Sequence, residues 1–321
     1  MTLFGLDRAV SAFGDAMRSG ALHHAWLLGG PQGVGKASFA RIAATRLLAD
    51  AAGPKVELPG LDVPEGHRIA HLIRAGSHPD FRWLKRELND KGDALRRNIT
   101  VKQVRKLGEL FAVQPALSDW RAVVIDSVDE LEPSAANALL KMLEEPPGRS
   151  VFFLVSHSPG RLLPTIRSRC RRLAFEPLDD DAMASALAIA RPGIPPADLR
   201  RLLAVAGGSV GRALNFAELD MAPIEQLARE ILRTGDRDNQ QRSKLSSMLA
   251  LKAAAPRYAA FLELVPPMIA NEARHGEGRC QQAALAAYER ARETVAVAPR
   301  MSLDPAATVF QLGSILASIA T

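Results

Sequence analysis

The stretch that decides the fold is Gly30-Pro31-Gln32-Gly33-Val34-Gly35-Lys36. It matches the glycine-rich phosphate-binding loop as far as the lysine of that motif. An apolar run over residues 25–29 precedes the loop and a helical pattern over residues 37–48 follows it, which is the context that the motif requires. There the loop amides and the start of the helix face the phosphates, and Lys36 neutralises the outer ones. The sequence predicts a nucleotide-binding α/β fold; the alternative is a glycine-rich turn that only packs a strand against a helix.

The position after Lys36 lacks a hydroxyl group that nucleotide-hydrolysing proteins use. A Ser or Thr normally holds the magnesium ion that bridges the terminal phosphates, whereas this chain has Ala37. Ser38 comes next, but successive helical residues are rotated by about 100°, so we expect its hydroxyl to point away from the metal position. The cofactor that the loop predicts is ATP, bound through Gly30, Gly33, Gly35, Lys36, Ala37 and Ser38.

A second element of the predicted nucleotide site is Asp126, which follows the apolar run 123–125. A carboxylate at the end of a buried strand can hold magnesium directly or through water; the alternative is an aspartate that merely caps a strand. Hydrolysing proteins place a glutamate at the next position to activate water, but a serine, Ser127, cannot act as a base at neutral pH. Asp129 and Glu130 lie further on and are expected on a solvated face. We therefore expect ATP binding with little or no hydrolysis.

The first half of the chain alternates apolar runs with helical patterns, which predicts a parallel sheet. The expected strands are residues 25–29, 81–85, 122–125, 151–156 and 172–175. A helix is expected over residues 134–145, opened by Pro133. Strand patterns stop after Pro177. We predict an α/β domain over residues 1–176, a small helical domain over residues 177–221 and a larger all-helical domain over residues 222–321.

Composition fits a globular protein of a reducing compartment. Hydrophobic residues make up 47% and charged residues 24% of the 321 residues. The sequence has no uninterrupted run of about 18 apolar residues, so a membrane span is not expected. The first fifteen residues are not typical of a secretory signal. The two cysteines give no disulfide framework, so a cytoplasmic location is expected. The net charge of +6 permits contact with nucleic acid phosphates, or is simply spread over solvated faces.

Two longer stretches carry a family resemblance. They are Ala135-Ala136-Asn137-Ala138-Leu139-Leu140-Lys141-Met142-Leu143-Glu144-Glu145-Pro146-Pro147 and Leu162-Leu163-Pro164-Thr165-Ile166-Arg167-Ser168-Arg169-Cys170. Both resemble stretches shared by clamp-loader subunits of the AAA+ family, and the second ends in the Ser-Arg-Cys motif of that family. Residues 22–27 and 207–213 fit the same group, and the chain as a whole resembles the delta-prime family of the bacterial DNA polymerase III clamp loader. This resemblance implies an AAA+ phosphate-binding domain with a five-stranded parallel sheet, a helical lid domain and an all-α collar domain for oligomerisation.

The resemblance also implies roles for individual residues. Arg169 matches the arginine finger, a cation that reaches into the ATP site of a neighbouring subunit and stabilises charge on the transferring phosphoryl group. The alternative is that Arg169 belongs to an ordinary basic edge. Arg212 matches the sensor arginine of the lid, which touches bound nucleotide; the alternative is a surface arginine at a helix start. Either Ser156 or Ser158 matches the sensor position after the fourth strand.

The implied function is that of a subunit in a ring-shaped clamp loader. Its expected partners are a gamma/tau-like motor subunit and a delta-like subunit, with the sliding clamp and primed DNA contacted through the complex, and no membrane. Polymerase chemistry belongs to the holoenzyme and is not expected in this chain. The alternatives are an ATP-hydrolysing motor subunit of the same loader, a phosphoryl-transfer enzyme acting on a small molecule, and a structural ring component that binds no nucleotide.

One departure from the family concerns zinc. Many delta-prime relatives carry a four-cysteine zinc module shortly after the first helix that follows the glycine loop, but residues 50–74 contain no cysteine. His67, His71 and His78 lie in or near this segment, and three histidines without cysteines or closely placed acids are a poor structural zinc site. We predict no zinc and no other metal site.

Overall fold

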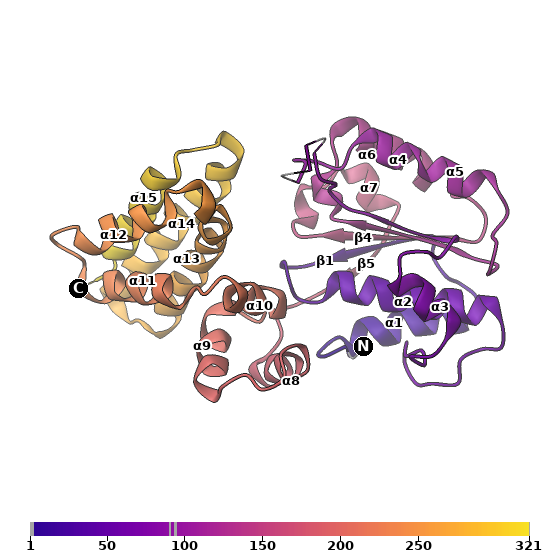
Figure 1. The fold of residues 1–321 in the computed structure, drawn as a ribbon, viewed down its shortest axis with the longest axis horizontal. Coiled ribbons are helices and arrows are strands. Elements are labelled where there is room, and N and C mark those ends of the chain that lie inside the picture. Colours follow the sequence, from indigo (N-terminus) through magenta and orange to yellow (C-terminus); the bar gives the residue numbers. More distant parts are fainter. Residues whose placement is uncertain (1–2, 90, 93–94, 321) are drawn as a thin grey trace. The chain divides into compact units, whose positions relative to one another are not determined.

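The computed structural model describes residues 3–89, 91–92 and 95–320 (Figure 1). The chain forms two compact units, residues 1–186 and residues 187–321. The helix α8 (Asp180–Ala190), which the sequence assigns to the lid, extends across the boundary between them. The predicted division into three domains therefore stays a prediction, and each unit is described by itself.

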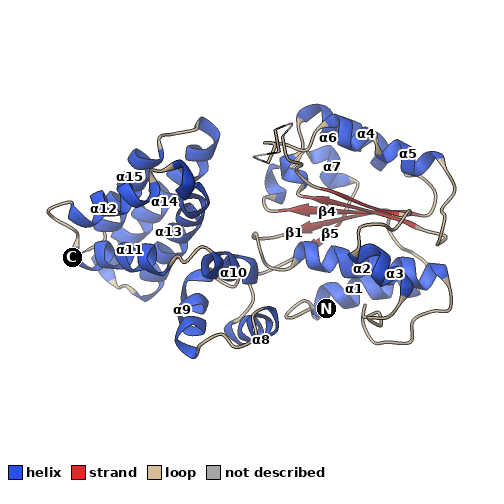
Figure 2. Ribbon diagram, viewed as in Figure 1, coloured by secondary structure: helices blue, strands red, loops and turns tan. Residues whose placement is uncertain are grey.

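The first unit is built on a five-stranded parallel sheet (Figure 2). Its strands follow one another across the sheet in the order β2-β3-β4-β1-β5, and they are β1 (Ala25–Gly29), β2 (Phe81–Leu84), β3 (Arg121–Asp126), β4 (Ser150–Ser156) and β5 (Arg171–Ala174). All five predicted strands are confirmed, each to within one residue at either end. Because neighbouring strands are parallel, the carboxyl ends of β1, β3 and β4 meet at one edge, where ligands bind in open α/β sheets.

Helices cover both faces of this sheet (Figure 1). On one face lie α1 (Asp7–Arg18), α2 (Lys36–Ala52) and α3 (Arg68–Arg74); on the other lie α4 (Val101–Arg105), α5 (Leu107–Ala112), α6 (Pro133–Glu144) and α7 (Pro164–Ser168). Alternate residues of a strand point to opposite faces, so the sheet contributes to two cores. Trp26 and Phe153 pack with Phe13 of α1 in the first core, and Leu27 and Phe152 lie in the second.

Sequence patterns predict the bounds of α6 more closely than those of α2. Helix α6 begins at Pro133 and buries Ala136, Leu139 and Leu143, as its period of apolar residues predicts. Helix α2 begins one residue before and ends four residues after the predicted range of 37–48. The extension covers alanines, which are the strongest helix formers, and it shortens the loop that leads to α3.

The second unit is entirely helical in its described residues. Its helices after α8 are α9 (Pro196–Ala206), α10 (Val210–Glu218), α11 (Ala222–Thr234), α12 (Gln240–Leu249), α13 (Ala255–His275), α14 (Gly278–Met301) and α15 (Pro305–Ala317). Short 3-10 turns occur at Val128–Glu130 and Pro159–Arg161 in the first unit and at Lys252–Ala254 in the second. In the described part of the chain, no helix is both long enough and apolar enough to span a membrane.

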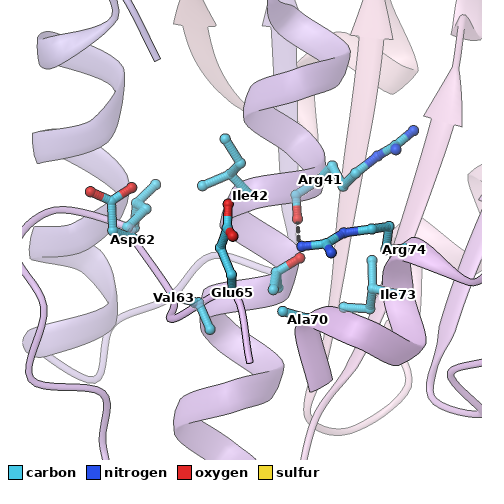
Figure 3. A pocket seen from close by; sticks show the side chains of 10 residues that line it. Arg41, Ile42, Asp62, Val63, Glu65, Ala70, Ile73 and Arg74 are labelled. Carbon is cyan, nitrogen blue, oxygen red and sulfur yellow. Dashed lines mark hydrogen bonds between the residues drawn. The ribbon is translucent and has the colours of Figure 1, made fainter. Parts of the chain in front are cut away.

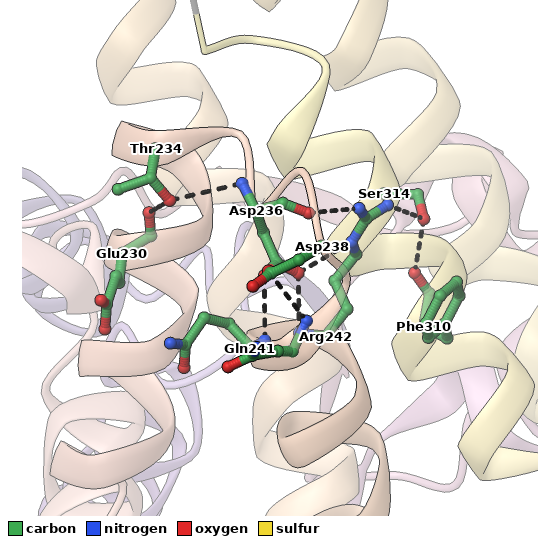
Figure 4. Close-up of polar contacts among 9 residues, drawn as sticks. Glu230, Thr234, Asp236, Asp238, Gln241, Arg242, Phe310 and Ser314 are labelled. Atoms are coloured by element: carbon green, nitrogen blue, oxygen red, sulfur yellow. Dashed lines mark hydrogen bonds and ion pairs between the residues drawn. The ribbon is translucent and has the colours of Figure 1, made fainter.

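A buried ion pair joins three helices of this unit (Figure 4). Asp236, in the turn between α11 and α12, has a side chain that is only 1% exposed, and it accepts a 2.9 Å bond from Nε of Arg242. It also accepts bonds from the backbone amides of Gln241 and Arg242. Arg242 in turn donates to Ser314 of α15 at 3.0 Å. The pair therefore fixes the α11–α12 turn against α15.

Candidate nucleotide site and exposed arginine

The glycine loop begins where β1 ends, and its first glycine is required by crowding. Gly30 has a φ of 156°, and a Cβ atom there would lie 2.0 Å from the carbonyl oxygen of Phe175. Its amide donates to the carbonyl of Ser156 at 3.2 Å, which ties the loop to the end of β4. Gly35 precedes α2 with a φ of 95°, a conformation that costs glycine little. The strand, loop and helix therefore follow one another as the sequence predicts.

Lys36 turns back onto its own loop. Its side chain is buried, and its ammonium donates to the carbonyl oxygen of Gly30 at 2.6 Å and to that of Pro31. Burial lowers the pKa of Lys36 from 10.5 to about 8, while the negative charges of Asp129 and Asp126 oppose that shift. The cation is thus held by neutral backbone oxygens and is incompletely neutralised. An anion at the start of α2 would gain from it.

Ala37 lies in the first turn of α2, and Asp126 lies at the end of β3. Ala37 is half-buried and its methyl group packs against the first core; its part in a magnesium site stays a prediction. Asp126 ends β3, and burial raises the pKa of its carboxyl against the opposing charges of Lys36, Lys85 and Arg41. In the described part of the chain, no group of three or more His, Cys, Asp or Glu side chains is placed to hold a metal.

Asp129 is exposed, as predicted, but it is more than a solvated charge. Its carboxylate accepts bonds from Ser156 Oγ at 2.9 Å, from the amide of His157 at 2.6 Å and from the amide of Ser158 at 3.3 Å. Ser127 Oγ donates to it as well, at 3.2 Å. Asp129 therefore ties the segment after β3 to the end of β4. The partners at the end of β4 lie 27 to 29 residues away, so no local pattern could have identified them.

The two candidate sensor serines differ in environment. Ser156 is completely buried at the end of β4, and its hydroxyl bonds to Asp129. Ser158 is half-buried and its amide donates to Ser156 Oγ at 3.2 Å. His157 lies between them; burial lowers the pKa of its imidazole, and the charge of Lys36 lowers it further. That electrostatic coupling brings His157 into the surroundings of the glycine loop, and the sequence alone gave no reason to single it out.

Arg169 lies immediately after α7 and is partly exposed. Its side chain is 34% exposed, and Nη2 lies 2.7 Å from Oε1 of Glu144 at the end of α6. Nη1 donates to the carbonyl of Thr165 at 3.0 Å. The next residue, Cys170, has its thiol pKa raised to about 12 by burial. The Ser-Arg-Cys motif thus presents a cation next to an inert thiol.

Arg212 belongs to the second unit, whereas the glycine loop belongs to the first. Ser209 caps α10 by accepting the amide of Arg212 at 3.1 Å. The guanidinium donates to the carbonyl of Ala206 at 3.0 Å and lies 3.6 Å from Glu263. These contacts anchor Arg212 within its own unit. Its contact with nucleotide stays a prediction.

The segment that corresponds to the zinc module of many relatives is organised by an arginine. Arg46 pairs with Asp50 at 2.9 Å and donates to the carbonyls of Val56, Leu58 and Asp62. His67 caps α3 and His78 accepts the amide of Asp80, so both imidazoles have local structural roles. A pocket of about 280 Å³ lies nearby (Figure 3), lined by residues that include Arg41, Ile42, Glu65, Ile73 and Arg74. It does not include the glycine loop.

The chain is similar in sequence to DNA polymerase III subunits. The family model described as DNA polymerase III, delta subunit, matches residues 5–179. A DNA polymerase III subunit delta-prime from Pseudomonas aeruginosa is 41% identical over 190 residues, which cover 58% of this chain and 53% of that protein. Its counterpart from Bacillus subtilis is 30% identical over 214 residues, covering 66% and 59%. These matches span somewhat over half the length of either relative.

A solved structure also aligns with the chain. A gamma-subunit-related protein of DNA polymerase III from Thermotoga maritima aligns with 97% of this chain and 98% of its own, at 16% identity and a TM-score of 0.44.

Proposed function

Because the chain belongs to the DNA polymerase III delta-subunit family, as a subunit of the delta-prime type, we propose that it lends Arg169 to the ATP site of a neighbouring clamp-loader subunit. The loader would then open a sliding clamp and place it on primed DNA. Its other members would include a motor subunit of the gamma/tau type and a delta-like subunit. A trans arginine couples ATP hydrolysis to assembly, since neither subunit has a complete site alone.

The exposure of Arg169 is the observation that carries this proposal. Its side chain is one-third exposed and contacts α6 and α7, whereas Lys36 is buried against its own loop. A cation that must reach another subunit has to keep part of its surface open. Arginine suits this role because its planar group presents several donors to a phosphate at once.

The chain's own nucleotide site would play a passive part. The loop glycines and Lys36 are retained, Ser38 lies in the first turn of α2, and Asp126 supplies the acid, so ATP can be held there. Ala37 and Ser127 lack the groups that would hold magnesium and activate water. We expect little turnover at this site, with Arg212 as the lid residue that contacts bound nucleotide.

Replacing Arg169 with alanine in a reconstituted loader tests the proposal. We expect ATP turnover at the site that Arg169 completes to fall by about 10³-fold or more, the range measured for arginine fingers. Assembly, measured by size-exclusion chromatography, should be unchanged because the side chain is partly exposed. The matched control is Arg161→Ala, an exposed arginine of the same unit. Unchanged DNA-stimulated turnover in Arg169→Ala would refute the finger role.

A further inference from the structure

The contact between Glu144 and Arg169 joins two rigid elements. Glu144 is the last residue of α6, and Arg169 directly follows α7. Leu143 and Ile166, the neighbouring apolar residues of the two helices, are each 2% exposed in the same core. Their burial fixes the two backbones relative to each other, so the ion pair, with 2.7 Å between Arg169 Nη2 and Glu144 Oε1, joins two side chains whose backbones are held in place.

Helix stability does not explain a glutamate at this position. The carboxyl end of a helix carries a partial negative charge, and a carboxylate there is unfavourable unless a cation offsets it. Glu145 follows directly and is also exposed, so α6 ends on two adjacent acids. Arg169 offsets the charge of Glu144, which gives this carboxylate a partner on another helix.

The bonds to the guanidinium leave part of it open. A guanidinium has five N–H donors. Within the described residues, Thr165 and Ser168 accept bonds from Nη1, and Nη2 forms an ion pair with Glu144 at 2.7 Å. In that part of the chain Nε has no partner, so this edge of the guanidinium is open to a phosphate oxygen.

We propose that Glu144 is a positioning residue for Arg169, holding one edge of the guanidinium so that the open edge is presented to the neighbouring subunit's ATP. This inference rests on the proposed function. An arginine side chain that is held in one rotamer loses less conformational freedom when it engages the phosphate. A partly exposed pair is also weak enough for the charge of ATP to rearrange it.

The test compares loaders that carry Glu144→Ala or Glu144→Gln with the matched control Glu145→Ala. We expect Glu144→Ala to lower the kcat of DNA-stimulated ATP turnover by about threefold to fivefold, the size of one partly exposed charge pair. The KM for ATP should not change, because the finger acts on the transition state. Glu144→Gln should recover part of the loss, since its amide oxygen can still approach Nη2 but carries no full charge. Glu145→Ala should have no effect.

A second background separates positioning from a general structural defect. In Arg169→Ala loaders, Glu144→Ala should cause no further loss of kcat, because the residue it positions is gone. An equal loss in both backgrounds, or a kcat that is unchanged or raised by Glu144→Ala alone, would overturn the positioning role. If Arg169→Ala lowers turnover and Glu144→Ala does not, only this inference fails. If Arg169→Ala itself has no effect, the proposed function fails with it.

Discussion

Two cations of this chain, the buried Lys36 and the largely buried Arg242, have opposite surroundings. Lys36 donates to the carbonyls of Gly30 and Pro31, which are neutral. Arg242 donates to the buried carboxylate of Asp236 at 2.9 Å and to Ser314 at 3.0 Å. Both side chains are largely withdrawn from water, but only the arginine has a full counter-charge within bonding distance.

The difference separates a cation that holds the fold together from one that is suited to bind a ligand. Burying a charge is costly unless it is paired and hydrogen-bonded. Arg242 meets both conditions, and it also lies over the ring of Phe310 with 5.4 Å between the guanidinium carbon and the ring centroid. Lys36 is hydrogen-bonded but not paired with an opposite charge, and burial therefore lowers the pKa of its ammonium. A phosphate would supply the charge that Lys36 lacks.

The largest effect is expected from removing the counter-charge of Arg242. Asp236→Asn should lower the free energy of unfolding of the helical unit by about 3 kcal/mol, because it leaves Arg242 buried without a counter-charge. Hydrogen exchange of α12 and α15 measures this locally, since Arg242 joins these helices. The matched control is Asp238→Asn; Asp238 is exposed and accepts only a 3.3 Å bond from Gln240 among the contacts described.

The pH dependence of the same variant has a defined sign. Burial opposes ionisation of Asp236, but the amides of Gln241 and Arg242 and the Arg242 side chain outweigh it and hold the pKa below 3.8. A depressed carboxyl pKa stabilises the folded state above the ordinary value, and this contribution is lost as the pH falls through the folded value. The difference between wild type and Asp236→Asn should therefore shrink below pH 3.8. A constant difference down to pH 2 would contradict the pairing, on the scale of carboxyl titration.

An intermediate effect is expected from restoring the missing hydroxyl beside Lys36. Ala37→Ser should raise ATP affinity about tenfold in magnesium, about 1.4 kcal/mol, because the hydroxyl adds a metal ligand next to a cation that already lacks a counter-charge. Equilibrium binding of a fluorescent ATP analogue, with magnesium and with EDTA, measures this gain. Ser38→Ala is the control and should leave the difference between magnesium and EDTA unchanged, because its hydroxyl is expected to point away from the metal position. A gain that is the same without magnesium would count against the metal-site explanation.

Strand positions and the order of elements around the glycine loop could be predicted because each depends on local patterns. The apolar run before Asp126 and the period of α6 are examples, and both are confirmed. The pairing of Arg169 with Glu144 and the bonds from Ser156, His157 and Ser158 to Asp129 could not be predicted, because these partners are separated by 25 or more residues. The direction of Lys36 was also inaccessible, since a sequence motif specifies a residue type and not its rotamer.

The smallest effect is expected from removing the charge of Lys36, which has no counter-charge within bonding distance. Lys36→Met removes the charge and keeps much of the length of the side chain. The folded pKa of Lys36 is about 8 against an ordinary 10.5, so between these values the unfolded chain binds more protons than the folded chain, and stability rises with pH. The free energy of unfolding of wild type, relative to that of Lys36→Met, should therefore rise by about 1 kcal/mol between pH 7 and pH 9.

Urea unfolding followed by tryptophan fluorescence reports on the correct unit for this measurement, because Trp26, Trp83 and Trp120 all lie within residues 1–186. At pH 7 without ATP, the uncompensated charge should make wild type less stable than Lys36→Met. Saturating ATP should reverse this order, since the phosphates then supply the counter-charge and only wild type benefits from it. A difference between the two proteins that is independent of both pH and ATP would mean that Lys36 is as fully compensated as Arg242, and the contrast between the two cations would be lost.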